Sequence, residues 1–333
     1  MKCNCLLVLG AFLLTISRAE AVGVPVLTMA ERASAADVIV LGRVTSSSQV
    51  GVATLDDFGE KVPSRVMAAK LHVQEVFKGT PGISDITLRF LLPDAPIGYA
   101  SPPVGVSAIF FLKQTGGEYS FANPYDPFVV GMPAATPEGG KLVDRLTACV
   151  GAVIESTETS SDQKRQAIHD LLIIPGNLST QALQFASHLA DPTVRLTAVA
   201  VLLVRNDISG LQLAADVLLR PAEGLPSEVR QNLISGIGMV KDPQAVPTLA
   251  TLLRQGDDRV RVAAARALVN TASPSAIDPL AEALDDRDSQ VRFYAVLGLA
   301  KITGQNDWRP NTDDFRDREA SYLSHWKEWR RGR

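Results

Sequence analysis

Residues 37–130 alternate between short apolar runs and clusters of turn-forming residues. The first run, DVIVLGRV at 37–44, is rich in β-branched residues, and comparable runs lie at 66–77, 86–92, 106–113 and 119–121. Runs of this length and composition, bounded by Gly, Pro and Asp, are typical of strands. Within 66–77 the apolar phase shifts before Val76, which predicts a β-bulge. The pattern predicts five or six strands in a small antiparallel barrel or sandwich, preceded by a short helix or loop at 27–36.

From residue 141 onwards the apolar positions follow a helical period instead. The preceding residues 133–140 (PAATPEGG) carry no apolar period and predict a linker. A Val-Arg pair then recurs with arginine spacings of 35, 31 and 31, at Val194-Arg195, Val229-Arg230, Val260-Arg261 and Val291-Arg292. The last two periods, 243–273 and 274–304, each fit a short helix, an Asp-rich turn and a second helix. A fixed period of this size indicates stacked helical units.

The second helices of these units share a stripe of small and apolar residues, such as Ala264 and Leu268. Period, spacing and stripe together resemble HEAT repeats, in the short variety also seen in proteins related to phycobilisome lyases. The resemblance covers 178–304, with 141–177 as a degenerate leading pair. It implies a ladder between adjacent units formed by a D-x-x-x-R motif, which stands here as Asp191, Arg195, Arg230, Asp257, Arg261, Asp288 and Arg292. Pro226 replaces the Asp beside Arg230, which puts one junction of the ladder in question.

A second resemblance lies in the strand region. The segments ADVIVLGRV, HVQEVFKG, DITLRF and GVSAIFFL resemble the netrin and tissue-inhibitor module, which is an OB-like β-barrel. The matching positions are Ala36, Asp37, Gly42, Val44, Val73, Val76, Lys78 and Gly79. Inhibitory members of that family chelate a protease metal through an N-terminal cysteine, whereas this chain has Val22 at the expected mature start. The resemblance therefore implies a partner-binding barrel, acting through loops such as 49–63 or 92–103, but not metalloprotease inhibition.

The N-terminal segment has the pattern of an export signal. Lys2 precedes an apolar run at 5–16, and Ala19-Glu20-Ala21 fits a cleavage site. The run is shorter than the about 20 residues that a membrane-spanning helix needs. We expect cleavage after Ala21 and an exported protein, periplasmic or secreted; the alternative is an uncleaved anchor. The predicted organisation is a signal peptide at 1–21, an OB-like β-barrel domain at 22–132, a linker at 133–140, a HEAT-like α-solenoid at 141–304 and a C-terminal capping helix at 305–333.

The capping helix is predicted from one aromatic face. The last unit of a repeat array leaves an apolar face uncovered and needs a cap. Within 313–330, one helical face carries Phe315, Tyr322, Leu323, Trp326 and Trp329. Because the tail ends in several arginines, the alternative is a helix that lies on a membrane surface. The acidic residues at the start of the helix favour the cap.

Composition and charge narrow the class of protein. The chain has 333 residues, of which 46% are hydrophobic and 21% are charged, and its formal net charge is −3. This composition is globular, and the negative charge gives no reason to expect a nucleic-acid partner. Cleavage of the signal removes two of three cysteines, so Cys149 is left without a disulfide partner. Its apolar helical context favours a buried core residue over a nucleophile.

No residue pattern in the chain predicts catalysis. The four histidines, His72, His169, His188 and His325, have no metal-ligand spacing. The sequence also lacks a phosphate-binding glycine loop and a nucleophile-elbow motif. Paired acids before the predicted helices fit helix N-caps. We therefore expect a non-enzymatic protein with no cofactor and no metal site.

The remaining candidates for function are surface positions on the second helices, which in HEAT proteins usually line the concave face. The predicted partner-binding residues are Arg266, Asn270, Phe293, Tyr294, Asn232 and Gln231. Phe293 and Tyr294 are equally open to packing against the terminal Trp helix. We expect a monomeric scaffold for a protein or peptide partner. Two alternatives stay open, an accessory lyase-like enzyme with a site between barrel and solenoid, and an envelope inhibitor that acts through the barrel loops.

Overall fold

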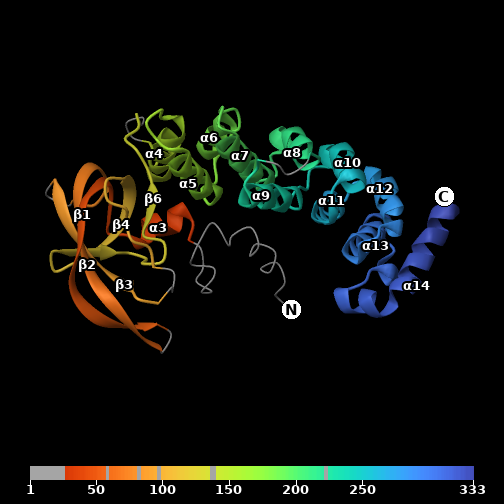
Figure 1. Cartoon of the computed structure of the whole chain (residues 1–333), viewed down its shortest axis with the longest axis horizontal. Coiled ribbons are helices and arrows are strands. Elements are labelled where there is room, and N and C mark those ends of the chain that lie inside the picture. The colour runs from red at the N-terminus through yellow and green to blue at the C-terminus, as the bar shows by residue number, and fades with distance from the viewer. Residues whose placement is uncertain (1–26, 58–59, 81–83, 96–98, 136–139, 221–223) are drawn as a thin grey trace. The chain divides into compact units, whose positions relative to one another are not determined.

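The computed structural model describes residues 27–57, 60–80, 84–95, 99–135, 140–220 and 224–333 (Figure 1). Contacts divide the chain into two compact units, the first ending at Ala186 and the second spanning Ser187–Arg333. A β-rich part is followed by helices, as predicted. The predicted signal peptide and residues 136–139 of the linker lie outside the described residues, and the domain boundaries stay predictions. No helix in the described part of the chain is both long enough and apolar enough to cross a membrane.

Six strands in the first unit form one sheet: β1 (Val38–Asp57), β2 (Glu60–Lys78), β3 (Asp85–Pro93), β4 (Ser107–Thr115), β5 (Glu118–Phe121) and β6 (Phe128–Val130). The strand order is β1-β2-β3-β5-β4-β6, and β1 also pairs with β4, so the pairings run through five strands and return to β1. All pairs are antiparallel except β3–β5, which meet in parallel at Leu88 and Tyr119. Alternate side chains from the strands, among them Leu71 and Phe110, form one apolar core.

The predicted bulge lies in β2. Val76 pairs with Val40 and Val73 pairs with Gly42, and the register shifts leave Gln74 and Phe77 as extra residues. The predicted bulge is therefore confirmed.

The prediction of a loop at 49–63 is wrong, because β1 and β2 continue as a long hairpin to Asp57 and Glu60. In the outer part of β1 the exposed positions carry apolar residues such as Val50 and Val52, and the positions between them are only half-buried. The segment therefore lacks the alternation of apolar and polar residues that marks a strand in sequence.

Helix α3 (Met29–Ala35) precedes the sheet, and α4 (Leu142–Glu155), α5 (Ser161–Leu172) and α6 (Asn177–Ala186) follow it. Helices α4 and α5 pack against β6, and α3 contacts both α4 and β4. Arg145 of α4 pairs with Glu75 of β2 at 2.7 Å, and its guanidinium lies 4.9 Å from the centroid of the Phe77 ring. Helices α3, α4 and α5 therefore pack with the sheet as one unit.

Four of the motif residues, Ala36, Asp37, Lys78 and Gly79, lie together at the end of α3. Lys78 Nζ donates to the carbonyl oxygens of Ala33 at 2.8 Å and Ala36 at 2.6 Å, which satisfies the last carbonyl groups of the helix. Gly79 has a φ of 78°, and a Cβ there would lie 2.8 Å from the Asp37 carbonyl oxygen. Only glycine fits this position without displacing the neighbouring backbone. The motif therefore holds α3 against the sheet.

Cys149 lies fully buried in α4, as predicted. Burial raises the pKa of its thiol to about 11, so the thiol is protonated at neutral pH. Its carbonyl oxygen accepts a hydrogen bond from Met132 N at 2.9 Å, which ties α4 to the segment after β6. The residue belongs to the packing of the first unit.

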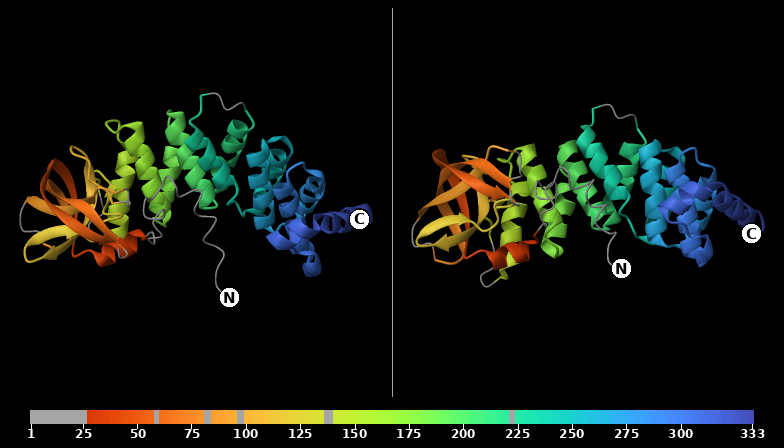
Figure 2. Two further views of the ribbon diagram at one scale, coloured as in Figure 1. Left: turned by 60° about the horizontal axis from the view of Figure 1, so that its bottom comes forward. Right: turned by 90° about the horizontal axis from the view of Figure 1, so that it is seen from below.

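The second unit is helical, with α7 (Pro192–Val204), α8 (Leu211–Leu218), α9 (Ser227–Ile237), α10 (Val246–Gln255), α11 (Asp258–Thr271), α12 (Ile277–Glu282), α13 (Ser289–Thr303) and α14 (Thr312–Arg331). Helices α7, α9, α11 and α13 pack in series as one layer, and α8, α10 and α12 cover it as the other (Figures 1 and 2). A Cβ at Gly298 would lie 2.6 Å from Leu280 Cδ1, and one at Gly236 would lie 2.9 Å from the Ala200 carbonyl oxygen. Small residues therefore let helices approach closely, as expected from the predicted stripe.

Helix α14 covers the end of this unit. It packs against α12 and α13 through Phe315, Tyr322 and Trp326, which are at most 4% exposed. An aromatic face that is already buried is not free to lie on a membrane. The packing is that of a terminal cap.

Candidate interaction surface

Four arginines occupy equivalent repeat positions near the start of the second helices. Each guanidinium donates to a carbonyl oxygen at the end of its own first helix or in the turn that follows: Arg195 to Leu189 at 3.0 Å, Arg230 to Leu218 at 3.2 Å, Arg261 to Gly256 at 3.3 Å and Arg292 to Asp286 at 2.7 Å. Arg230 reaches its carbonyl although the turn before α9 is longer than the others. The arginine therefore satisfies carbonyl groups that the first helix leaves unpaired.

Three of these arginines also pair with an acidic group of the following helical unit. Arg230 pairs with Asp257 at 2.6 Å, Arg261 with Asp286 at 2.8 Å and Arg292 with Glu319 of α14 at 2.5 Å. Burial opposes ionisation of Asp286, but the hydrogen bonds from Arg261 and the Asp288 N–H hold the pKa of that carboxyl below its usual value. The pairs link consecutive units as the HEAT resemblance implies.

The predicted ladder differs from the structure in its acidic members. Asp288 caps α13 by accepting from Gln290 N at 2.8 Å, and the partner of Arg261 is Asp286, two residues earlier. Asp191 likewise caps α7. Asp257 does both, since it caps α11 and pairs with Arg230. At the remaining position the N-cap of α9 is Pro226, which makes no side-chain hydrogen bond to the helix.

The solvent side of the second helices carries an array of nine residues, four apart along a helix and 31 apart between helices. Its members are Gln231, Ser235 and Met239, then Val262, Arg266 and Asn270, then Phe293, Leu297 and Lys301. Lys301 is exposed and the other eight are half-buried. We call this the second-helix array.

The polar members at the end of the array join neighbouring helices. Asn270 Nδ2 donates to the Gly238 carbonyl oxygen at 3.1 Å, and Lys301 Nζ donates to the Val269 carbonyl oxygen at 2.9 Å. These donor–acceptor pairs are equivalent, one repeat apart. Lys301 and Asn270 therefore satisfy carbonyl groups at the ends of α11 and α9, which gives both residues a structural role.

Two of the predicted partner-binding residues lie outside the array. Asn232 is 3% exposed, so its interpretation as a surface position is wrong, because the helix turns it into the packed layer. Tyr294 is half-buried, and its ring centroid lies 5.4 Å from that of Phe293. Phe293 lies 5.4 Å from Phe315 of α14, which places it against the terminal helix. Gln231 accepts a hydrogen bond from Arg259 at 3.3 Å.

Arg266 stands at the centre of the array. Its Nη2 contacts Met239 Sδ at 3.5 Å, which is a weak acceptor. No carboxylate lies within ion-pair distance of it among the described residues. Val262 and Leu297 are half-buried at adjacent array positions. Arg266 thus provides a cation that no described carboxylate pairs with, at array positions next to the apolar residues Val262 and Leu297. The sequence analysis missed Met239, Val262 and Leu297. The 31-residue period would have found them from predicted positions, because they lie one period from Asn270, Gln231 and Arg266, respectively.

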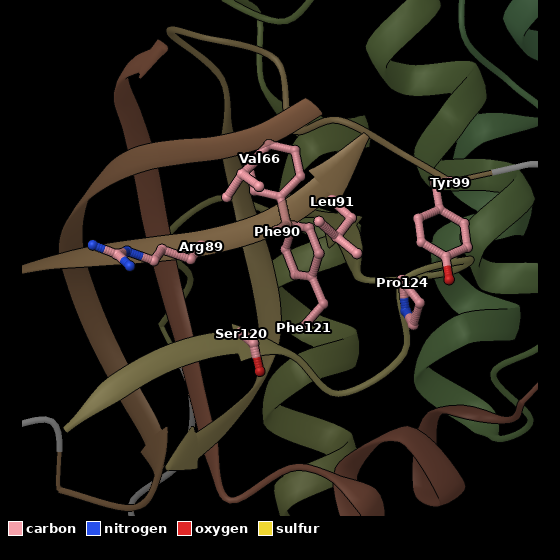
Figure 3. Close-up of a pocket in the computed structure, with 8 residues that line it drawn as sticks. All are labelled: Val66, Arg89, Phe90, Leu91, Tyr99, Ser120, Phe121 and Pro124. Atoms are coloured by element: carbon pink, nitrogen blue, oxygen red, sulfur yellow. The ribbon is translucent and has the colours of Figure 1, made fainter. Parts of the chain in front are cut away.

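A separate apolar pocket of about 280 Å³ lies in the first unit, where β3 and β5 diverge. Figure 3 shows Tyr99 and Pro124 on one side of it, facing Leu91 and Phe121, while Arg89 points away. A buried cavity of about 150 Å³ holds a benzene ring, so this pocket has room for an apolar group of one or two rings.

A buried charged cluster joins α3 and α5 to the sheet. Arg32, 4% exposed, pairs with Asp126, and Asp170 accepts from Val130 N at 3.1 Å and from Gln166 Nε2 at 3.0 Å. Loss of hydration raises the pKa of Asp170 to about 7, against the lowering effect of these hydrogen bonds and of Arg32. The neighbouring His169 is buried too, and burial followed by the charge of Arg165 lowers its pKa to about 4. Across the described residues, no group of three or more His, Cys, Asp or Glu side chains is placed to hold a metal ion.

One family model matches part of the helical region. Residues 215–300 match the family model for HEAT repeats. Among solved structures, an engineered protein is 20% identical, with 49% of this chain and 83% of that chain covered and a TM-score of 0.34. The Escherichia coli protein YibA is also 20% identical, with 53% and 67% covered and a TM-score of 0.32. No curated protein matches the chain. The HEAT-repeat match thus identifies the helical solenoid of the second unit.

Proposed function

We propose that this protein is an exported, non-enzymatic scaffold that binds a protein partner through the second-helix array. HEAT-repeat solenoids commonly serve as interaction scaffolds, and the array is the part of this one whose side chains suit that role. The observation that carries the proposal is the half-buried Arg266 among Met239, Val262 and Leu297. Arginine, methionine and aromatic residues are enriched in the cores of protein interfaces.

The chemistry of the array defines the partner. A guanidinium is weakly hydrated and pairs well with a carboxylate in a planar, two-bond geometry. The partner segment would therefore present an acidic side chain flanked by apolar ones. Such a pair becomes partly desolvated on binding, which strengthens it relative to an exposed pair.

We further propose that the first unit is an OB-like barrel of the netrin type and that the chain reaches the periplasm or the exterior after signal cleavage. The order β1-β2-β3-β5-β4, with a return to β1, supports the barrel. The positions shared with the netrin family support it as well, since Lys78 and Gly79 meet Ala36 and Asp37 in space. The apolar N-terminal run supports export.

The proposal is tested by capture from an extract of the native cells with two charge-reversal variants. Arg266→Glu places an anion where the partner carries a carboxylate, whereas Arg309→Glu reverses an exposed charge outside the array. We expect quantitative mass spectrometry to show one or a few proteins lost with Arg266→Glu and retained with Arg309→Glu. Equal capture by both variants and by the unchanged chain, with equal thermal stability, contradicts the role of the array.

A further inference from the structure

Contacts between α9, α11 and α13 fix the arrangement of the second-helix array. Asn270 Nδ2 of α11 donates to the Gly238 carbonyl oxygen of α9 at 3.1 Å, and Lys301 Nζ of α13 donates to the Val269 carbonyl oxygen of α11 at 2.9 Å. Both pairs are 32 residues apart, so equivalent positions of neighbouring helices lie side by side. The members of the array therefore form a grid of three rows of three, in which each helix supplies one column.

All apolar members of this grid lie on or beside one diagonal. Met239 at the end of α9, Arg266 in the middle of α11 and Phe293 near the start of α13 form the diagonal, and successive members are 27 residues apart. Val262 and Leu297 stand next to Arg266, one on each side of the diagonal. All of these side chains are half-buried, so each keeps some surface for a partner.

The cation lies at the centre of this diagonal, and polar residues lie away from it. Arg266 Nη2 contacts Met239 Sδ at 3.5 Å, which shows that diagonal neighbours touch. The polar members fill the remaining positions of the grid, with Gln231 and Lys301 at the two far corners and Ser235 and Asn270 beside the diagonal. An apolar centre with a polar rim is the usual composition of a protein interface.

The spacing along the diagonal selects the secondary structure of the occupant. Positions four apart on a helix differ by about 6 Å along its axis, and packed helices lie about 9 Å apart, so one diagonal step measures about 11 Å. Residues seven apart on an α-helix share one face and lie about 10.5 Å apart. Residues on one face of a strand recur at about 6.7 Å or about 13 Å instead. A helix matches the diagonal step and a strand does not.

We propose, on the basis of the proposed function of the array, that the partner presents an amphipathic α-helix along the diagonal Met239–Arg266–Phe293. The residue opposite Arg266 is Asp or Glu, because no described carboxylate pairs with this guanidinium. The residues seven before and seven after the acid are large and apolar, and they contact Met239 and Phe293. Amphipathic helices bind apolar surfaces through such recurring anchors, and apolar contacts around a central charge pair exclude water from it.

Site-specific photo-crosslinking of the full chain in living cells, with the adducts mapped by mass spectrometry, tests the proposal. The photoreactive residue replaces Met239 in one variant and Phe293 in another. Two diagonal steps span about 22 Å, so the two adduct sites should lie about 14 residues apart in one helical segment of the partner, against about 6 or 7 residues in an extended chain. The same residue at Gln231, off the diagonal, is the matched control and should give a lower yield.

Reciprocal charge reversal tests the central contact. The acidic residue midway between the two adduct sites, changed to Lys in the partner, should weaken binding to the unchanged chain by about tenfold or more and restore binding to Arg266→Glu. Arg309→Glu is the control that should show no such restoration. Adduct sites at the extended spacing or in separate segments, or a charge reversal that restores nothing, overturn the helix and leave the proposed function standing. The absence of an adduct from both diagonal positions contradicts the proposed function, and this inference fails with it.

Discussion

Replacing Arg261 by methionine should uncouple two adjacent helical units. Arg261 is the most buried member of the arginine row, with its side chain 8% exposed, and its partner Asp286 is 12% exposed. The two form a bidentate pair, with Nε to Oδ2 at 2.8 Å and Nη2 to Oδ1 at 3.0 Å. Methionine keeps the aliphatic packing of the side chain but leaves Asp286 buried without its cation. Removal of one partner of a buried pair costs about 3–5 kcal/mol, and we expect about 3 kcal/mol here because the pair is not fully buried.

Arg254→Met is the matched control. Arg254 and Glu282 are paired at 3.3 Å between the same two units, but their side chains are 54% and 48% exposed. Exposed pairs contribute about 0–1 kcal/mol, so the free energy of unfolding should fall by less than about 1 kcal/mol. The difference between the two variants isolates the effect of burial.

Urea unfolding followed by tryptophan fluorescence measures both losses. All three tryptophans, Trp308, Trp326 and Trp329, lie in or next to α14. Their signal therefore reports the end of the unit that depends on the Arg261 pair. A double-mutant cycle with Asp286→Leu should give a coupling energy of about 2 kcal/mol, within the range known for residues in contact. Equal losses for the Arg261 and Arg254 variants, or a coupling below about 0.5 kcal/mol, would refute the reasoning.

Four further predictions concern the first unit. The pKa of Asp170 is raised to about 7 in the folded chain, so below that pH the folded chain binds more protons than the unfolded chain and loses stability as the pH rises towards 7. The melting temperature of Asp170→Asn should therefore rise relative to that of the unchanged chain between about pH 5 and about pH 8. A difference in melting temperature that does not change with pH refutes this. The pKa of His169 is lowered to about 4, so the stability that this residue contributes is lost as the pH falls below about 6.5. In the same melts, His169→Gln should abolish this loss of stability at low pH. Gly79→Ala should cost more than about 2 kcal/mol in urea unfolding, because it adds a clash to the positive φ, whereas Gly116→Ala, with φ of 59° in open space, should cost about 1 kcal/mol; equal costs would contradict the close contact. Cys149 should resist a maleimide in the native state and react after denaturation, and fast native labelling would contradict its burial.

The regular features of the second unit could be predicted because they repeat. The Val-Arg period placed Arg195, Arg230, Arg261 and Arg292 at equivalent positions, and the structure gives all four an equivalent carbonyl acceptor. The Asp residues before the helices act as N-caps for the reason inferred from sequence, since their carboxylates accept from free N–H groups. Features fixed by local chemistry and by period are thus visible in one sequence.

The acidic partners could not be predicted in the same way. Asp286 rather than Asp288 meets Arg261, because the direction in which a carboxylate points depends on the turn and not on its spacing. Glu319 meets Arg292 from α14, which lies beyond the repeats and follows no period. The burial of Asn232 depends on the rotation of α9 against its neighbours, which residue polarity misjudged.

The strand region shows a different limit. The buried strands were visible from their apolar runs, but the outer part of the β1–β2 hairpin was not, since Val50, Val52 and Thr54 are exposed and the residues between them are only half-buried. Periodicity marks a strand through the contrast between a wet face and a dry one. Where that contrast is weak, only the pairing with β2 identifies the strand.

Site-specific photo-crosslinking in living cells tests the central claim, that the second-helix array binds a protein partner. The photoreactive residue is placed at Leu297, in the array, and at Thr251 of α10, which is also half-buried but lies in the other layer. The account predicts a discrete adduct with one partner from Leu297, and its loss when Arg266 is changed to Glu. Adducts of equal yield from both positions, or an adduct from Thr251 alone, would contradict it.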